Sequence, residues 1–123
     1  MTEETALATA LKTNLGALPN LVESQGNTLR RFGGESVMMQ EAVMQKGTTF
    51  EPHQHHNEQL VLVLEGRLRL DVGPDSTPVT LSAGDLYLLP PHTLHGGEAL
   101  EKTRLIDAFS PPRTTVLGEE EPE

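Results

Sequence analysis

The side chains with the clearest capacity for chemistry lie between residues 53 and 59, where the sequence reads HQHHNEQ. Residues two apart on an extended strand share a face, so His53 and His55 project together, and Gln59 has the same parity. Neutral imidazole is the commonest protein ligand for metal ions, and two imidazoles on one face can hold a single cation. The segment therefore predicts a metal site that needs a further ligand from elsewhere in the chain.

Two more histidines, His92 and His95, stand in PPHTLHGG, a stretch bounded by proline and glycine. A lone histidine is usually a surface residue or a hydrogen-bonded core residue, and we favour this interpretation for His56 and His92. An HxH pair beside an apolar strand, together with a distant histidine in a turn, is instead a constellation typical of a metal site.

Composition limits the classes of partner. The chain has 123 residues, with 18 acidic and 9 basic side chains and a formal charge of -9. This length fits a single domain, and this charge repels a nucleic-acid backbone, so we expect no nucleic-acid partner. Cysteine is absent, so nitrogen and oxygen atoms must hold any metal. The longest aliphatic run, Leu60 to Leu64, is too short to span a bilayer, and we expect a soluble, cytoplasmic protein without a membrane partner.

The pattern of apolar residues divides the chain into an N-terminal extension (1–34), a β-barrel (35–113) and an acidic tail (114–123). Four leucines of the extension recur at helical spacing and predict a short amphipathic helix: Leu7, Leu11, Leu15 and Leu18. Within the barrel, short β-like runs alternate with glycine and proline, which predicts an all-β sandwich or barrel. The predicted strands are Val37–Met44, Thr48–Pro52, Gln59–Glu65, Arg67–Val72, Pro78–Leu81, Leu86–Leu89 and Arg104–Ser110.

Two of these runs differ in their patterning. RLRLDV, residues 67–72, alternates strictly between apolar and polar residues and predicts a half-buried strand. LVLVL, residues 60–64, does not alternate, so we expect a central strand that is covered on both sides.

The glycines around the HxH pair give the sequence a resemblance to the cupin superfamily of small jelly-roll β-barrels. The first cupin motif reads Gly, five residues, His-x-His, three or four residues, Glu, six residues, Gly. All of its spacings are met here by Gly47, His53, His55, Gln59 and Gly66, with glutamine where most relatives have glutamate. The resemblance implies a cupin jelly roll whose glycines occupy turns of positive φ.

The second cupin motif reads Gly, five residues, Pro-x-Gly, two residues, His, three residues, Asn. Here it keeps Gly84, Pro90 and His95, while His92 and Ala99 replace its second glycine and its asparagine. The metal ligands that the resemblance implies are His53, His55, Gln59 and His95. The neighbouring side chains are expected to face mostly away from the metal: Gln54, His56, Asn57 and Glu58.

A finer resemblance lies in RLIDAFSPPR, residues 104–113. Together with HxHxxEQ, this run is similar to bacterial cupins of pectin and alginate breakdown that convert unsaturated uronates to linear keto sugars. That resemblance implies a substrate pocket containing Asp107, Phe109 and Arg113. Phe109 could equally be a core residue and Arg113 a surface charge. Asp107, however, is costly in an apolar strand unless it meets a cation or hydrogen-bond donors.

The implied ligand set carries no charge. Three imidazoles and an amide leave a divalent ion uncompensated, so we expect an anionic substrate and non-redox activation of a carbonyl, hydroxyl or water. By the same reasoning, Gln59→Glu should bind the metal more tightly and an anionic substrate more weakly. Zinc, nickel, manganese and iron are all compatible with such ligands, so one divalent metal of this group is expected.

The leading functional hypothesis is a metal-dependent isomerase or lyase-like enzyme of carbohydrate metabolism that acts on a small, anionic sugar acid. Two alternatives stay open. One is a mononuclear iron dioxygenase-type cupin, which would consume oxygen. The other is a non-catalytic cupin that binds a metal or small molecule. A homodimer is also expected, as a general prior for a small sandwich with an extra N-terminal segment.

Overall fold

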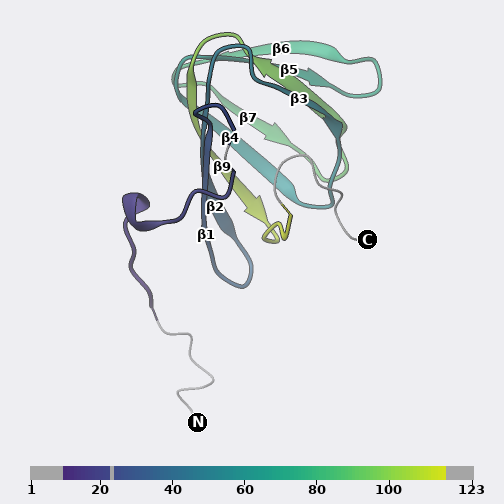
Figure 1. Ribbon diagram of the computed structural model, residues 1–123. Helices are drawn as coiled ribbons and strands as arrows, with labels where there is room; N and C mark the ends of the chain where they lie inside the picture. Colours follow the sequence, from purple (N-terminus) through teal and green to yellow (C-terminus); the bar gives the residue numbers. More distant parts are fainter. Residues whose placement is uncertain (1–9, 23, 116–123) are drawn as a thin grey trace.

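The computed structural model describes residues 10–22 and 24–115, which form two antiparallel β-sheets packed face to face (Figure 1). A short 3-10 helix, η1 (Leu15–Ala17), precedes the strands. The strands are β1 (Thr28–Gly33), β2 (Met38–Met44), β3 (Thr49–His53), β4 (Glu58–Glu65), β5 (Arg67–Val72), β6 (Thr77–Ser82), β7 (Leu86–Leu89), β8 (His95–Ala99) and β9 (Thr103–Ser110). The predicted all-β class is confirmed.

The sheet order brings distant parts of the sequence together. One sheet has the order β1-β2-β9-β4-β7, and the other has the order β3-β8-β5-β6. Strand β9 therefore lies between β2 and β4, and β8 lies between β3 and β5. The second of these placements puts His95, at the start of β8, directly opposite His53, at the end of β3.

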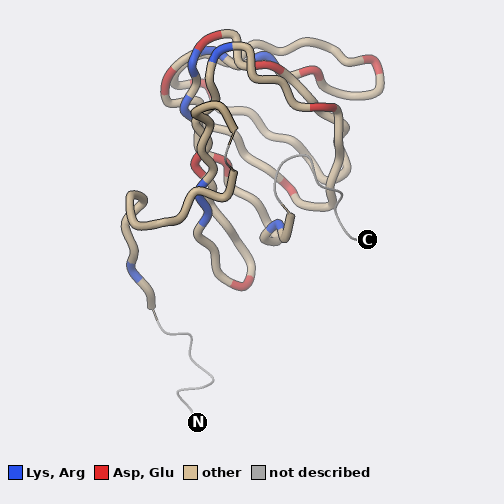
Figure 2. Tube along the Cα trace, in the orientation of Figure 1, with Lys and Arg blue, Asp and Glu red and all other residues tan. Residues whose placement is uncertain are grey.

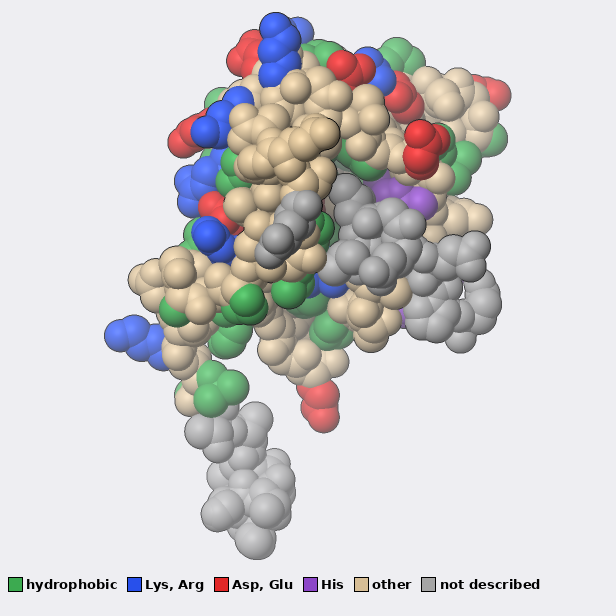
Figure 3. All heavy atoms as spheres, viewed as in Figure 1, with side chains coloured by type: hydrophobic (Ala, Val, Ile, Leu, Met, Phe, Trp, Pro, Cys, Tyr) green, Lys and Arg blue, Asp and Glu red, His purple; other side chains and the backbone are tan. Residues whose placement is uncertain are grey.

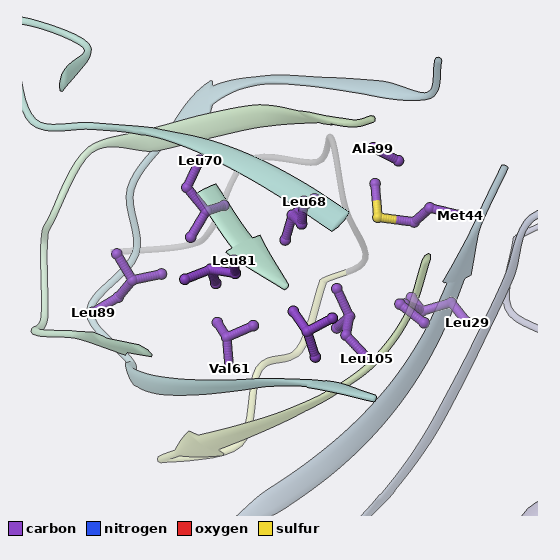
Figure 4. Close-up of a cluster of buried hydrophobic side chains, with 11 residues drawn as sticks. Leu29, Met44, Val61, Leu68, Leu70, Leu81, Leu89, Ala99 and Leu105 are labelled. Carbon is purple, nitrogen blue, oxygen red and sulfur yellow. The ribbon is translucent and has the colours of Figure 1, made fainter. Parts of the chain in front are cut away.

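The hydrophobic core lies between the sheets. In β9 every second residue from Thr103 to Phe109 is buried, as period-two alternation requires for a strand with one inward face. Figure 4 shows the inward leucines and valines of the two sheets pointing toward one another. The buried core cluster comprises Leu29, Ala42, Met44, Val61, Val63, Leu68, Leu70, Leu81, Leu89, Ala99 and Leu105.

The backbone conformation of two turns explains which residues occupy two positions of the cupin motifs. Gly66, between β4 and β5, has a φ of 91°, and a Cβ there would collide with the carbonyl oxygen of Lys102. Glycine is therefore required both by the backbone conformation and by the close approach. His92 also has a positive φ, of 64°, and occupies the position where the second cupin motif has glycine. Histidine is one of the side chains that tolerate this region better than most.

Strand β4 differs from the sequence prediction. Val61 and Val63 are buried, but Leu60 is 48% exposed, so LVLVL is covered on one side rather than on both. The physical reason is the two-layer architecture: the four-stranded sheet covers the inner face of β4, and no second layer from the described residues covers its outer face. The run LVLVL is unbroken because β4 carries apolar side chains on its exposed outer face as well as on its buried inner face.

The predicted N-terminal helix is wrong over its described part. Residues 10–14 are not helical, and only the single turn η1 follows, with the Asn14 side chain accepting a hydrogen bond from the N–H of Gly16. Leu11 is 75% exposed, so the amphipathic pattern finds no apolar surface to pack against. Leu7 lies outside the described residues. The described residues contain no helix with the length and apolarity needed to cross a membrane.

Candidate metal centre

Three histidines converge between the sheets. His53 ends β3, His55 lies in the loop that follows, and His95 begins β8, and their potential ligand nitrogens all lie within 4.8 Å of one another. The ring centroids of His53 and His95 are 4.4 Å apart. Strands β3 and β8 can approach this closely because Gly96 has no side chain: a Cβ there would crowd the backbone of residues 50–52. Figure 3 shows histidine side chains at the molecular surface; within this cluster His55 and His95 are buried and His53 is half-buried.

Each imidazole is oriented by a backbone carbonyl. The Nδ1 atoms of His53, His55 and His95 lie 3.1, 3.1 and 2.8 Å from the carbonyl oxygens of Glu51, Asn57 and Thr93. Because a carbonyl oxygen can only accept a hydrogen bond, each Nδ1 must carry the proton. In the neutral ring Nε2 then keeps its lone pair. This is the arrangement that fixes histidine as a metal ligand through Nε2.

Gln59, on the inner face of β4, completes the cluster with an unusual contact. Its Nε2 atom donates to Oδ1 of Asp107 at 3.0 Å, so its Oε1 atom points the other way and lies 3.1 Å from Nε2 of His55. With the proton of His55 on Nδ1, two acceptor atoms face each other. A cation between them would satisfy both lone pairs, so the four side chains fit a divalent metal.

The protonation states support this fit. Burial lowers the pKa of His55 from 6.5 to about 4, with a further contribution from the positive charge of Arg113. Burial likewise lowers the pKa of His95 to about 4. Both rings are therefore neutral at pH 7, and a neutral imidazole is the form that binds a metal.

Asp107, on β9, is buried in a network of amides. Its Oδ2 atom accepts from Nε2 of Gln40 at 2.8 Å, and Oε1 of Gln40 accepts from Nε of Arg31 at 2.7 Å. Burial raises the pKa of Asp107 from 3.8 to about 6, against the opposing effect of these hydrogen bonds. The pKa of this carboxyl group therefore lies close to neutral pH, as is common for acid–base groups in functional sites.

The centre opens into a cavity of about 270 Å³ between the sheets. His53, Gln59 and His95 line it together with Asp107 and Arg113, and leucine, valine and methionine side chains form much of the remaining wall. A cavity of this size suits a small molecule rather than a polymer.

Arg113 and Phe109 lie at the polar side of this cavity. The guanidinium carbon of Arg113 is 5.6 Å from the ring centroid of Phe109, and its Nη2 atom donates to Oγ1 of Thr115 at 3.3 Å. Arg113 is only 6% exposed, so it is not an ordinary surface charge. Phe109 is buried and also lines the cavity, which unites the two interpretations that its sequence position allowed.

The structure brings together all seven side chains that the sequence singled out for the site. His56 and His92 are exposed. Asn57, however, is fully buried, and its side-chain amide donates to the carbonyl oxygen of Pro111. Asn57 therefore ties the histidine loop to the segment that carries Arg113. Gln40 was also missed; its only signal is a polar residue at an inward position of β2.

These features define a class of protein: a small antiparallel β-sandwich with three histidines and a glutamine gathered around an internal cavity. Residues 40–109 match the Cupin domain family. The chain belongs to the cupin family.

Several known proteins are similar to this chain. L-ectoine synthase from Nocardia farcinica (strain IFM 10152) is 32% identical over 91 residues, which cover 72% of this chain and 67% of that protein. An RmlC-like cupin from Shewanella frigidimarina NCIMB 400 superposes with a TM-score of 0.76 at 26% identity, covering 86% of this chain and 95% of that one. KdgF from Halomonas sp. has a TM-score of 0.63 at 31% identity, covering 70% and 81% respectively.

Proposed function

We propose that this cupin is a metal-dependent enzyme that isomerises a small, anionic sugar acid. The observation that carries the proposal is the contact between Oε1 of Gln59 and Nε2 of His55, two acceptor atoms 3.1 Å apart at the wall of a cavity. A divalent ion held by His53, His55, Gln59 and His95 would act as a Lewis acid on a substrate oxygen. Neutral ligands leave its charge available for an anionic substrate.

The other cavity residues have roles that follow from their chemistry. Arg113 can pair with a substrate carboxylate in the bidentate geometry of a guanidinium. Asp107, with its pKa raised by burial, is the candidate for moving a proton between substrate atoms. Phe109 forms cavity wall between them and holds Arg113 by a cation–π contact.

The substrate class comes from the run of residues 107–113, which resembles the uronate-linearising cupins. In an unsaturated uronate the ring opens and the released enol becomes a ketone, so atoms are neither gained nor lost and no co-reactant is needed. Proton transfer, an anchored carboxylate and a polarised oxygen are the three requirements, and Asp107, Arg113 and the metal ligands match them in turn. The similar proteins L-ectoine synthase and KdgF have different names, so similarity alone does not identify the substrate of this chain. The substrate needs a direct test.

The test combines metal analysis with an optical assay. Protein purified without a histidine tag should contain one divalent metal ion per chain, measured by elemental analysis. Incubation with unsaturated galacturonate or mannuronate should remove the ultraviolet absorbance of the conjugated alkene. Full metal content with no loss of absorbance would rule out unsaturated uronates as the substrate. Oxygen consumption would favour the dioxygenase alternative. A protein that contains metal but converts no compound in a broad panel of substrates would favour the non-catalytic alternative, a cupin that binds a metal or small molecule.

A further inference from the structure

We propose that Gln40 is a positioning residue of the metal centre, which holds the oxygen of Gln59 toward the metal by way of Asp107. This role rests on the metal site of the proposed function. Gln40 lies on β2 and is only 6% exposed. The strand registers place it between Arg31 on β1 and Asp107 on β9, so these side chains form one row across the five-stranded sheet.

The direction of the hydrogen bonds in this row is fixed by the chemistry of its first member. A guanidinium group can only donate, so the atom of Gln40 that meets Nε of Arg31 at 2.7 Å must be the amide oxygen. The amide nitrogen of Gln40 therefore faces β9, where it donates to Oδ2 of Asp107 at 2.8 Å. Both side chains of this second bond are buried, so the bond holds the carboxyl group of Asp107 in one orientation.

Gln59 lies diagonally across from Asp107. Asp107 is opposite Val61 in the strand register, and Gln59 comes two residues earlier on β4, within reach of a long side chain. Nε2 of Gln59 donates to Oδ1 of Asp107 at 3.0 Å, so Oε1 of Gln59 is turned toward Nε2 of His55, 3.1 Å away. The row of hydrogen bonds thus ends at the oxygen atom that would bind the metal.

The opposite orientation of the Gln59 amide would disable the site. An amide turned end for end would donate from its nitrogen to the lone pair on Nε2 of His55, and no ligand oxygen would face the metal. The hydrogen bond from Gln59 to Asp107 opposes this turn. Without Gln40 the carboxyl group of Asp107 can rotate away, and the amide of Gln59 then loses the bond that orients it. Gln40 would in this way control a metal ligand without touching the metal.

The test is a double-substitution cycle on Zn²⁺ affinity, measured by calorimetric titration of the full chain. Gln40→Met keeps the length of the side chain but removes its amide, and it should weaken Zn²⁺ binding about 10-fold, as is usual for groups that orient a metal ligand. In Gln59→Ala, which has no ligand oxygen to orient, Gln40→Met should have no further effect on Zn²⁺ affinity. Gln54→Met is the matched control, because Gln54 is exposed and should leave Zn²⁺ affinity unchanged.

The outcomes of this cycle are distinct. Additive losses from Gln40→Met and Gln59→Ala would overturn the inference, because a general loosening of the fold weakens binding whether or not residue 59 is a ligand. Wild-type affinity in Gln40→Met would overturn it as well. Circular dichroism checks the fold, and Gln40→Asn, whose shorter amide cannot span both partners, replaces Gln40→Met if that variant does not fold. A wild type that binds no Zn²⁺ would overturn the metal centre together with this inference, whereas a lack of uronate turnover would count against the proposed reaction alone.

A second inference concerns the substrate side of the cavity and also rests on the proposed function. We infer that Asn57 is a positioning residue that sets the place of Arg113 relative to the metal ligands. Asn57 lies in the loop between β3 and β4 and is nevertheless completely buried. Its backbone carbonyl accepts from Nδ1 of His55 at 3.1 Å, and its side-chain amide donates to the carbonyl oxygen of Pro111.

The two hydrogen bonds of Asn57 lead to two different binding groups. His55 is a proposed metal ligand, and Arg113, two residues after Pro111, is the proposed partner of a substrate carboxylate. Residues 111–115 have no regular secondary structure, so the position of Arg113 depends on side-chain contacts such as this one. The backbone of Asn57 therefore serves the metal site, and its side chain serves the anion site.

Truncating only the side chain should separate these two roles. Asn57→Ala keeps the backbone carbonyl, so Zn²⁺ affinity should stay close to that of the wild type. Pro111 is exposed, so water can replace the lost donor and the fold should persist. The Zn²⁺-loaded variant should bind galacturonate, an analogue that lacks the alkene of the proposed substrate, about 10-fold more weakly, because Arg113 is no longer held in place.

Calorimetric titration with galacturonate tests this inference in a cycle with Arg113→Ala. If Asn57 acts through Arg113, Asn57→Ala should add nothing to the loss already seen in Arg113→Ala. His56→Ala is the control, because His56 is an exposed neighbour in the same loop. Additive losses, or unchanged galacturonate affinity in Asn57→Ala, would overturn the inference, and Asn57→Ser takes its place if Asn57→Ala does not fold. A wild type that binds Zn²⁺ but no galacturonate would overturn the proposed substrate class together with it.

Discussion

On its inner face the five-stranded sheet presents a network of amides and a carboxylate, whereas the four-stranded sheet presents imidazoles. Gln40, Gln59 and Asp107 come from β2, β4 and β9, while His53 and His95 come from β3 and β8. A metal held by both sets would therefore connect the two layers. The two sheets thus contribute different groups. The four-stranded sheet supplies nitrogen ligands, whereas the five-stranded sheet supplies and orients an oxygen ligand and carries the carboxyl group proposed for proton transfer.

The outer faces of the two sheets also differ. On the four-stranded sheet Arg69 lies between Asp71 and Glu98 in a network of surface ion pairs. Figure 2 shows acidic and basic residues close together where β5 and β6 lie. The five-stranded sheet instead exposes apolar side chains, among them Met39, Leu60 and Leu88. One outer face carries a network of ion pairs, and the other carries a group of exposed apolar side chains.

Removing an imidazole from the four-stranded sheet should have the largest effect. His95→Ala should lose the bound metal and all metal-dependent turnover, because a neutral ring held at Nδ1 by Thr93 cannot be replaced by water. Elemental analysis after dialysis checks this, with His56→Ala as the control because His56 is exposed and outside the cluster. Full metal occupancy in His95→Ala would show that the ligand set is wrong.

Altering the five-stranded sheet should affect the chemistry more than the fold. Asp107→Asn, assayed at saturating metal, should lose about 10²- to 10⁴-fold in kcat, the usual value of a positioned acid–base group. Arg113→Lys should mainly raise KM, since an ammonium group cannot copy the bidentate geometry of a guanidinium. A wild-type kcat for metal-saturated Asp107→Asn would remove the proton-transfer role of Asp107.

The two sheets also differ in how far their contributions could be predicted from sequence. The histidines and turn glycines were predictable because their spacing is local, and Asp107 stood out as a charge in an apolar strand. Gln40 could not be recognised, because its partner Asp107 is 67 positions away. Strands β1 and β8 were missed: TLRRFG lies in the stretch assigned to the N-terminal extension, and HGGEA contains no β-branched residue and none of Phe, Tyr and Trp. The helix prediction failed because an amphipathic pattern specifies a face but not the surface that must cover it.

The pH dependence of stability should separate the sheets further, because their buried groups titrate in opposite directions. His55 and His95 have folded pKa values of about 4, below 6.5, so the unfolded chain binds protons first and stability falls as pH drops from 6.5 toward 4. Asp107 has a raised pKa of about 6, so it alone would add stability over the same range. Two histidines outweigh one aspartate.

Metal-free protein should therefore melt at a lower temperature at pH 5 than at pH 7, as followed by circular dichroism. Asp107→Asn removes the opposing contribution and should make this fall steeper. A metal-free wild type whose melting temperature rises on acidification would show that the carboxyl group, not the imidazoles, dominates the titration.

The smallest effects should come from ion pairs on the two outer faces, where burial of the acidic partner decides the outcome. Arg69→Ala should leave the melting temperature nearly unchanged, because Asp71 and Glu98 are 25% and 34% exposed and water can replace the arginine. Arg104→Ala leaves Glu41, which is only 5% exposed, with the more distant Arg30, at 3.8 Å, as its ion-pair partner among the described residues. An under-compensated buried carboxylate costs about 2 kcal/mol, so this variant should unfold measurably earlier in urea. Equal urea midpoints for the two variants would mean that Glu41 is as well hydrated as Asp71 and Glu98.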